Sequence, residues 1–145
     1  AGLSVVYAYP MTGRPDQPRP DGWDDIPGAR GCTPEACAFR DHAAELARLG
    51  VDRLFGLSTQ DTAYQAEAAA RLRLPFALLS DGELRLAHAL GLPTFRAGGR
   101  ALLKRLTLVV RGGVVMRAFY PVFPPDAAAG QVIDWLAAGR HLNGG

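Results

Sequence analysis

The stretch "RGCTPEACAF" (residues 30–39) holds both cysteines of the 145-residue sequence and carries the signals of a helix start. Thr33 is a candidate N-cap, and Pro34 suits the first helical position, where its missing N–H is not needed. We therefore expect a helix to begin here, with Cys32 just before its first turn and Cys37 inside it.

Strand and helix patterns alternate on both sides of this helix. Upstream, "LSVVYAYP" (Leu3–Pro10) is a β-branched and aromatic run, as expected of a buried strand. This order, with a hairpin late in the chain, predicts an α/β fold in which helices cover both faces of a mixed central sheet, a three-layer α/β/α domain. Downstream we expect strands at Val51–Ser58 and Pro75–Ser80, helices at Asp61–Leu74, 81–92 and 125–138, and two strands within Lys104–Tyr120 that turn at Gly112-Gly113.

Residues 11–30 are expected to form a long inserted loop, because prolines and glycines are too dense there for a helix or a central strand. Loops of this length inside a compact domain are uncommon and often functional. Trp23 is expected to anchor the loop to the body of the domain through apolar contacts. Since no repeat and no second domain is visible, residues 1–145 are taken as one domain.

The composition excludes several classes of protein. A net charge of +2 gives no strong attraction to nucleic acid or to a membrane surface, and 48% apolar residues suffice for a core. No apolar run approaches the ~18 residues of a membrane span, and the N-terminus has no signal-peptide pattern. Two cysteines are too few for a disulfide scaffold. We therefore expect a cytoplasmic protein with neither nucleic acid nor membrane as a partner.

The positions of the two thiols suggest redox chemistry. The thiolate is the nucleophile, and the start of a helix favours an anion, so this placement can lower a thiol pKa from ~8.5 into the range ~3.5–7.5. Five residues of helix advance ~7.5 Å and rotate ~140°. The Cα atoms of Cys32 and Cys37 are then roughly 8–9 Å apart, beyond the ~7 Å limit for a disulfide. A disulfide between them therefore requires the first turns of the helix to unwind.

Other interpretations of these residues stay open. Spacing alone fits two structural cysteines equally well, because free cysteine packs as a small hydrophobic residue. A zinc site is disfavoured, because the histidines are scattered and no second ligand pair exists, so no metal is expected. Glu35 suits the helix dipole better than a role in tuning Cys32. In the next helix, Thr62 and Gln65 have capping-box spacing.

The chain resembles the peroxiredoxins, and within them the bacterioferritin comigratory protein, or peroxiredoxin Q, subfamily. The resemblance runs from about Ser4 to Leu136, and the "GCTxEAC" element is fairly specific for the subfamily. The segments that occur in the family's order are "YAYP", "GCTPEACAFRD", "GVDRLFGLSTQD", "FALLSD", "ALGL" and "KRLTLVV".

This resemblance implies a thioredoxin-like fold and the thiol-dependent reduction of hydrogen peroxide and organic hydroperoxides. It makes Cys32 the peroxidatic cysteine and Cys37 the resolving cysteine, and it places Arg105 beside the peroxidatic sulfur. The implied cycle forms a Cys32 sulfenic acid and then an intramolecular disulfide, as in atypical two-cysteine peroxiredoxins. Thioredoxin or a similar dithiol protein would reduce that disulfide, with no metal or organic cofactor. The subfamily suggests a monomer, with a weak dimer as the alternative.

The chain departs from the family pattern ahead of Cys32. The family has proline seven residues before this cysteine and a hydroxyl residue three before it, whereas this chain has Asp25 and Ala29. An insertion explains the shift, so that Pro10 keeps the role of shielding the sulfur and Thr12 becomes the candidate hydroxyl. Backbone N–H groups near Gly31 are a second candidate for binding the peroxide.

A second departure lies at the start of the chain. Family members usually have an N-terminal hairpin before the first core strand, and this sequence begins almost at that strand.

Three functions are consistent with the sequence. The first is a peroxiredoxin that uses Cys32 and Cys37 as described. The second is a thiol-disulfide oxidoreductase on the same fold, which would react faster with protein disulfides than with peroxides. The third is a non-catalytic thioredoxin-like redox sensor, in which helix unwinding alters the binding of a partner.

Overall fold

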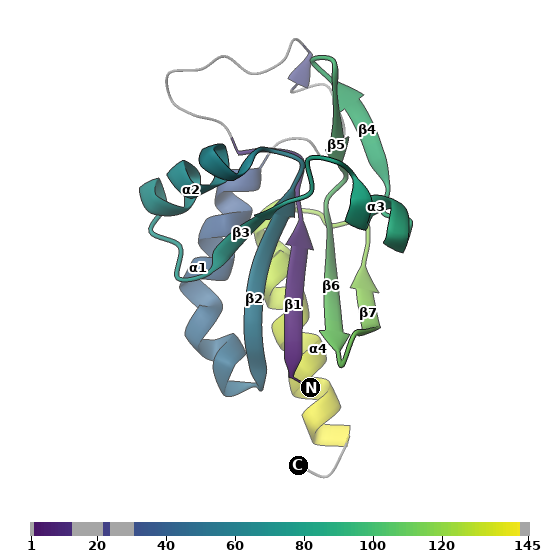
Figure 1. Cartoon of the computed structure of the whole chain (residues 1–145). Coiled ribbons are helices and arrows are strands. Elements are labelled where there is room, and N and C mark those ends of the chain that lie inside the picture. Colours follow the sequence, from purple (N-terminus) through teal and green to yellow (C-terminus); the bar gives the residue numbers. More distant parts are fainter. Residues whose placement is uncertain (1, 13–21, 24–30, 143–145) are drawn as a thin grey trace.

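A computed structural model describes residues 2–12, 22–23 and 31–142. Its centre is a five-stranded sheet with the order β3-β2-β1-β6-β7 (Figure 1). β1 pairs in parallel with β2 and antiparallel with β6, so the sheet is mixed, as predicted. The strands are β1 (Leu3–Ala8), β2 (Val51–Ser58), β3 (Ala77–Ser80), β6 (Leu106–Arg111) and β7 (Val114–Phe119).

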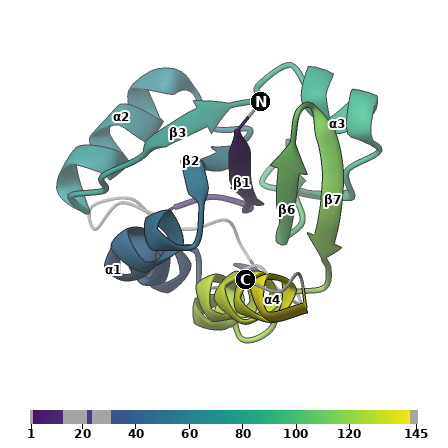
Figure 2. The same ribbon diagram turned by 90° about the horizontal axis from the view of Figure 1, so that it is seen from below.

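Helices cover both faces of the sheet. Figure 2 shows α1 (Cys32–Arg48) and α4 (Ala128–Leu142) side by side on one face and α3 (Arg85–Leu90) on the other. The helix α2 (Thr62–Arg71) contacts the edge strand β3 that follows it. The three-layer α/β/α prediction is therefore confirmed.

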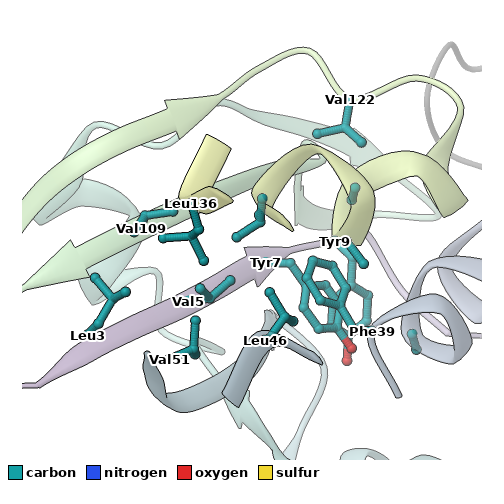
Figure 3. Close-up of a cluster of buried hydrophobic side chains, with 14 of the residues drawn as sticks. Leu3, Val5, Tyr7, Tyr9, Phe39, Leu46, Val51, Val109, Val122 and Leu136 are labelled. Atoms are coloured by element: carbon teal, nitrogen blue, oxygen red, sulfur yellow. The ribbon is translucent and has the colours of Figure 1, made fainter. Parts of the chain in front are cut away.

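The alternation of side chains along β1 produces the two cores. Leu3, Val5 and Tyr7 point into the larger core, under α1 and α4, whereas Val6 and Ala8 belong to the core under α3. Figure 3 shows Tyr7 stacked on Phe39 of α1 in the larger core, with the ring centroids 4.4 Å apart. These contacts fix the start of α1 relative to the carboxyl end of β1.

Two predicted helix caps were wrong. The N-cap of α1 is Gly31 rather than Thr33, because Gly31 adopts a left-handed φ of 98° and accepts the Glu35 N–H at 3.0 Å. The N-cap of α2 is Asp61, whose carboxylate accepts the Tyr64 N–H, and the side chain of Gln65 is buried instead of completing a capping box. In both cases the helix begins after a neighbouring residue, which spacing alone does not reveal.

The late hairpin was predicted correctly, whereas an earlier one was missed. β6 and β7 turn at Gly112-Gly113, and both glycines have positive φ, as a tight hairpin turn requires. The missed hairpin consists of β4 (Thr94–Ala97) and β5 (Arg100–Leu103), which form a separate two-stranded sheet. The 3-10 helix η2 (Pro125–Ala127) leads into α4 and packs against α1.

Candidate active site

Cys32 is the first residue of α1, and this helix starts at the edge of the sheet where β1 ends and β6 begins (Figure 1). The side chain is buried. The residue before Cys32 is Gly31, and both its backbone conformation and its surroundings require a glycine. Its φ is strained for a side-chain-bearing residue, and a Cβ would lie 2.5 Å from Cγ of Pro125 in η2. The close packing of η2 on Gly31 thus fixes the backbone beside the thiol.

Arg105 is the cation at this thiol, as the family resemblance implied. It lies directly before β6, and its Nη2 donates to Sγ of Cys32 at 3.3 Å. Its Nη1 donates to Oε1 of Glu35 at 2.6 Å. Arg105 and Glu35 are both buried, so this hydrogen bond lies inside the protein. The pair holds the guanidinium in one orientation, with one edge toward the thiol.

Glu35 is the site residue that the sequence interpretation missed, because it was assigned to the helix dipole. It follows Cys32 by three positions, which places both side chains on the same face of α1. That spacing was the available signal. Burial raises the pKa of Glu35 to about 8, although the charge and hydrogen bond of Arg105 pull it down. Its second oxygen, Oε2, has no hydrogen-bond partner among the described residues, which adds to the cost of ionisation.

The pKa of Cys32 is the result of opposing influences. Burial raises it, and this is the largest effect. The charge and the hydrogen bond of Arg105 lower it, as does the backbone N–H of Met11, whereas an ionised Glu35 raises it. The net direction is upward, so the expectation of a lowered pKa was wrong: the position at the helix start was recognised, but the depth of burial was not. Arg105 stays charged, since the neighbouring acidic groups raise its pKa against the effect of its burial.

Cys37 lies half-buried in the same unbroken helix, and it is not joined to Cys32 by a disulfide. Because α1 is helical from Cys32 through Arg48, the helix geometry separates the two sulfurs, as the sequence predicted. A disulfide between them requires the first turns of α1 to open.

The segment after β1 forms the other wall of the site. Pro10 is buried, and the N–H of Met11 donates to Cys32. Thr12 is also buried, and its hydroxyl donates a long bond of 3.4 Å to Oε1 of Gln60. Roles for Pro10, Thr12 and Gly31 in binding substrate stay predictions. Asp25 and Ala29, the positions that depart from the family pattern, lie outside the described residues.

The expected role of Trp23 as an anchor can be compared with the structure. Trp23 is 4% exposed and packs with Leu102, and its ring centroid is 6.3 Å from that of Phe95, as expected of an anchor for the loop.

Within residues 2–12, 22–23 and 31–142, no group of three or more His, Cys, Asp or Glu side chains is placed to hold a metal ion. No helix in these ranges has the length and apolarity needed to cross a membrane.

A buried thiol at a helix start, contacted by an arginine that lies directly before a strand of the central sheet, is the site of a thiol protein on the thioredoxin-like fold. The chain belongs to the redoxin family, whose model matches residues 5–133. Within that family it is a peroxiredoxin of the peroxiredoxin Q, or bacterioferritin comigratory protein, type.

The relatives that support this assignment come from plants and bacteria. The chain is 33% identical over 135 residues to the chloroplastic peroxiredoxin Q of Arabidopsis thaliana, covering 92% of this chain and 54% of the relative. It is 35% identical over 111 residues to the putative peroxiredoxin MT1643 of Mycobacterium tuberculosis, covering 76% of this chain and 71% of the relative. The chain therefore spans about half the length of the plant proteins it matches.

Solved structures agree with the fold. The peroxidoxin BcpB of Mycobacterium tuberculosis superposes with a TM-score of 0.75 at 30% identity, over 94% of this chain and 79% of that chain. A peroxiredoxin Q of Xanthomonas campestris superposes with a TM-score of 0.73 at 23% identity, over 94% of this chain and 78% of that chain, and this likeness concerns the fold alone.

Proposed function

We propose that this chain is a thiol peroxidase that reduces hydrogen peroxide and organic hydroperoxides. The observation that carries the proposal is the bond of 3.3 Å from Nη2 of Arg105 to Sγ of Cys32. A guanidinium at this distance stabilises the thiolate and also the negative charge that develops on a peroxide oxygen during attack. Peroxiredoxins of both plants and bacteria are among the relatives, which supports the same chemistry.

The proposed first step is a displacement at oxygen. The Cys32 thiolate attacks the terminal peroxide oxygen, the O–O bond breaks, and the alkoxide or hydroxide leaves and takes up a proton. Sulfur is oxidised to a sulfenic acid, and the peroxide is reduced by two electrons. The buried position of Cys32 keeps the leaving group and the developing charge close to Arg105.

The proposed second step uses Cys37. The start of α1 unwinds, the Cys37 thiolate attacks the Cys32 sulfur, the S–O bond breaks, and the hydroxide that leaves takes up a proton to form water. The product is an intramolecular disulfide. An external dithiol protein, thioredoxin or a similar reductant, then attacks this disulfide, passes through a mixed disulfide and leaves the chain with two thiols again. This cycle needs no metal or organic cofactor, and we propose that the chain performs it as a monomer in the cytoplasm.

The test is the reaction of the reduced protein with one equivalent of peroxide, followed by counting free thiols and by intact mass. We expect loss of both thiols and of two hydrogens within one monomer. Cys37→Ser should gain a single oxygen and then stall, and Cys32→Ser should not react. Survival of both thiols after stoichiometric peroxide would refute the proposal. Faster reaction with a protein disulfide than with peroxide would favour a disulfide oxidoreductase instead.

A further inference from the structure

A buried polar cluster lies behind the segment that follows β1. It gathers side chains from the carboxyl end of β2, from the start of α2 and from the end of β3. Three members, Ser58, Gln60 and Gln65, are between 0% and 6% exposed. A polar cluster this deep is stable only when its groups bond to one another, and it then holds the connected backbone in one position.

Gln60 makes the contact that matters for the thiol site. Its Oε1 accepts the backbone N–H of Thr12 at 3.1 Å, and its Nε2 donates to the backbone carbonyl of Thr12 at 3.1 Å. One side chain thus satisfies both backbone groups of one residue, as a neighbouring strand would. The N–H of Tyr9 donates to the carbonyl of Leu57 at 3.0 Å, so backbone pairing holds the chain up to this point. Beyond it, the Gln60 amide takes over that role.

The backbone of Gln60 is itself held in place. Its carbonyl accepts the Ser80 hydroxyl at 2.7 Å and the Gln65 amide at 3.4 Å, and its N–H donates to the Ser58 hydroxyl at 3.3 Å. The Gln65 amide also donates to that hydroxyl, at 2.7 Å. Gln60 is therefore anchored to two strands and a helix, and it transmits that rigidity to Thr12.

Thr12 is one residue away from a contact with the reacting sulfur. The preceding residue, Met11, donates its backbone N–H to Cys32. A hydrogen bond to a thiolate weakens steeply with angle and distance, so its strength depends on how the backbone of Met11 is fixed. On one side, β1 pairing fixes that backbone through Tyr9; on the other side, Gln60 fixes it through Thr12.

We propose that Gln60 is a positioning residue for Cys32: by clamping the backbone of Thr12, it aims the Met11 N–H at the Cys32 sulfur. Gln60 does not touch the thiol, and it acts only through this segment. The inference rests on Cys32 being the reacting thiol of the proposed peroxidase. The bonds of Arg105 to Cys32 and to Glu35 involve neither Gln60 nor Thr12, so we expect them to persist when Gln60 is changed.

The test compares Gln60→Met with Gln65→Met, both in a Cys37→Ser background so that Cys32 is the single thiol. Methionine keeps the length of glutamine and removes its hydrogen bonds. Gln65 is as buried as Gln60 and belongs to the same cluster, but its bonds go to Ser58 and to the Gln60 carbonyl rather than to Thr12. Without the Gln65 amide, the Gln60 carbonyl still accepts the shorter bond of 2.7 Å from the Ser80 hydroxyl, so Gln65→Met controls for the general cost of disrupting the cluster.

The readout is the pH dependence of Cys32 alkylation by iodoacetamide, with thermal unfolding measured in parallel. We expect Gln60→Met to raise the apparent pKa of Cys32 by about one unit, which slows alkylation about tenfold at pH values below that pKa. Gln65→Met should lower the melting temperature by a similar amount and leave the alkylation rate within about twofold of the parent. If Gln60→Met does not fold, Gln60→Asn, whose shorter side chain cannot reach both groups of Thr12, should show the same rise.

If a folded Gln60 variant keeps the alkylation profile of the parent, Gln60 does not position Cys32. An equal rise of the Cys32 pKa in Gln65→Met would lead to the same conclusion. Alkylation needs no peroxide. The two proposals can therefore be refuted separately. The role of Gln60 is refuted if the alkylation profile does not shift, even when peroxide consumes the thiols. The peroxidase proposal is refuted if peroxide leaves the thiols intact, even when the alkylation profile shifts.

Discussion

Replacing Arg105 by methionine tests how much of the reactivity of Cys32 depends on one cation. At an effective dielectric constant of about 20, unit charges separated by the 3.3 Å between Nη2 and Sγ attract by about 5 kcal/mol. This value is an upper limit, because the guanidinium charge is spread over several atoms. Hydrogen bonds to charged groups are worth about 1.5–3 kcal/mol in mutational series, which corresponds to one to two pKa units.

We therefore expect Arg105→Met to raise the pKa of Cys32 by about two units and to slow its reaction with peroxide about 100-fold at neutral pH. The variant also leaves Glu35 buried without its partner, which destabilises the fold unless the carboxyl stays protonated. The double variant Arg105→Met/Glu35→Gln removes that carboxylate. It should regain stability while the thiol stays slow, which separates the effect on chemistry from the effect on folding.

The assay combines stopped-flow measurement of peroxide consumption with alkylation of Cys32 across pH 5–10 in the Cys37→Ser background. Guanidinium ion added to the single variant should restore part of the rate if the missing charge is the cause. If the double variant alkylates with the parent's pH profile, Arg105 does not stabilise the thiolate, and the electrostatic account of this site is wrong.

Two further predictions concern residues around the thiol. The folded protein keeps the proton of Glu35 up to a pKa of about 8, whereas the unfolded chain releases it near the ordinary value of 4.5. The unfolding free energy should therefore fall as pH rises through this window, and Glu35→Gln should flatten the fall in denaturant titrations at pH 5, 6.5 and 8. An unchanged slope in the variant would mean that Glu35 is already ionised at low pH. In Gly31→Ala, the alanine has to adopt a positive φ, and its Cβ would lie 2.5 Å from Cγ of Pro125. We therefore expect the free energy of unfolding to fall by at least about 2 kcal/mol. Gly50→Ala is the control, because Gly50 has a φ of +102° but a Cβ there would have no neighbour within 4 Å, so only the backbone strain remains. Thermal unfolding should show a smaller loss of stability for Gly50→Ala than for Gly31→Ala. An equal loss at both positions would show that packing against Pro125 does not matter.

Local sequence was sufficient wherever hydrogen bonds or side-chain periodicity act over a few residues. The strand Val51–Ser58 was predicted with its observed bounds, as was the turn at Gly112-Gly113, where two glycines permit the positive φ of a tight turn. Helix starts were less well predicted, since the cap of α1 is Gly31, and a side chain at that position would meet Pro125, which is distant in sequence.

The hairpin of β4 and β5 was missed for a related reason. Its strands have only four residues each, too few for a clear alternation. Segments that are distant in sequence hold it in place. The ring of Trp23 packs near the ring of Phe95, and the Thr59 hydroxyl donates a hydrogen bond of 2.8 Å to the Ala101 carbonyl.

The sequence by itself determined the alternating α/β order, the position of both cysteines on one helix and, by resemblance, the presence of Arg105 at the thiol. Only the tertiary structure decided the protonation chemistry of the site. A pKa depends on burial and on the charges within a few ångströms, and those come from α1, from the residue before β6 and from the segment after β1, which the chain brings together only when folded. For the same reason, only the tertiary structure identifies Glu35 and Gln60 as parts of the site. Glu35 accepts a hydrogen bond from Arg105, and Gln60 holds the backbone of Thr12. In both cases the partner is distant in sequence.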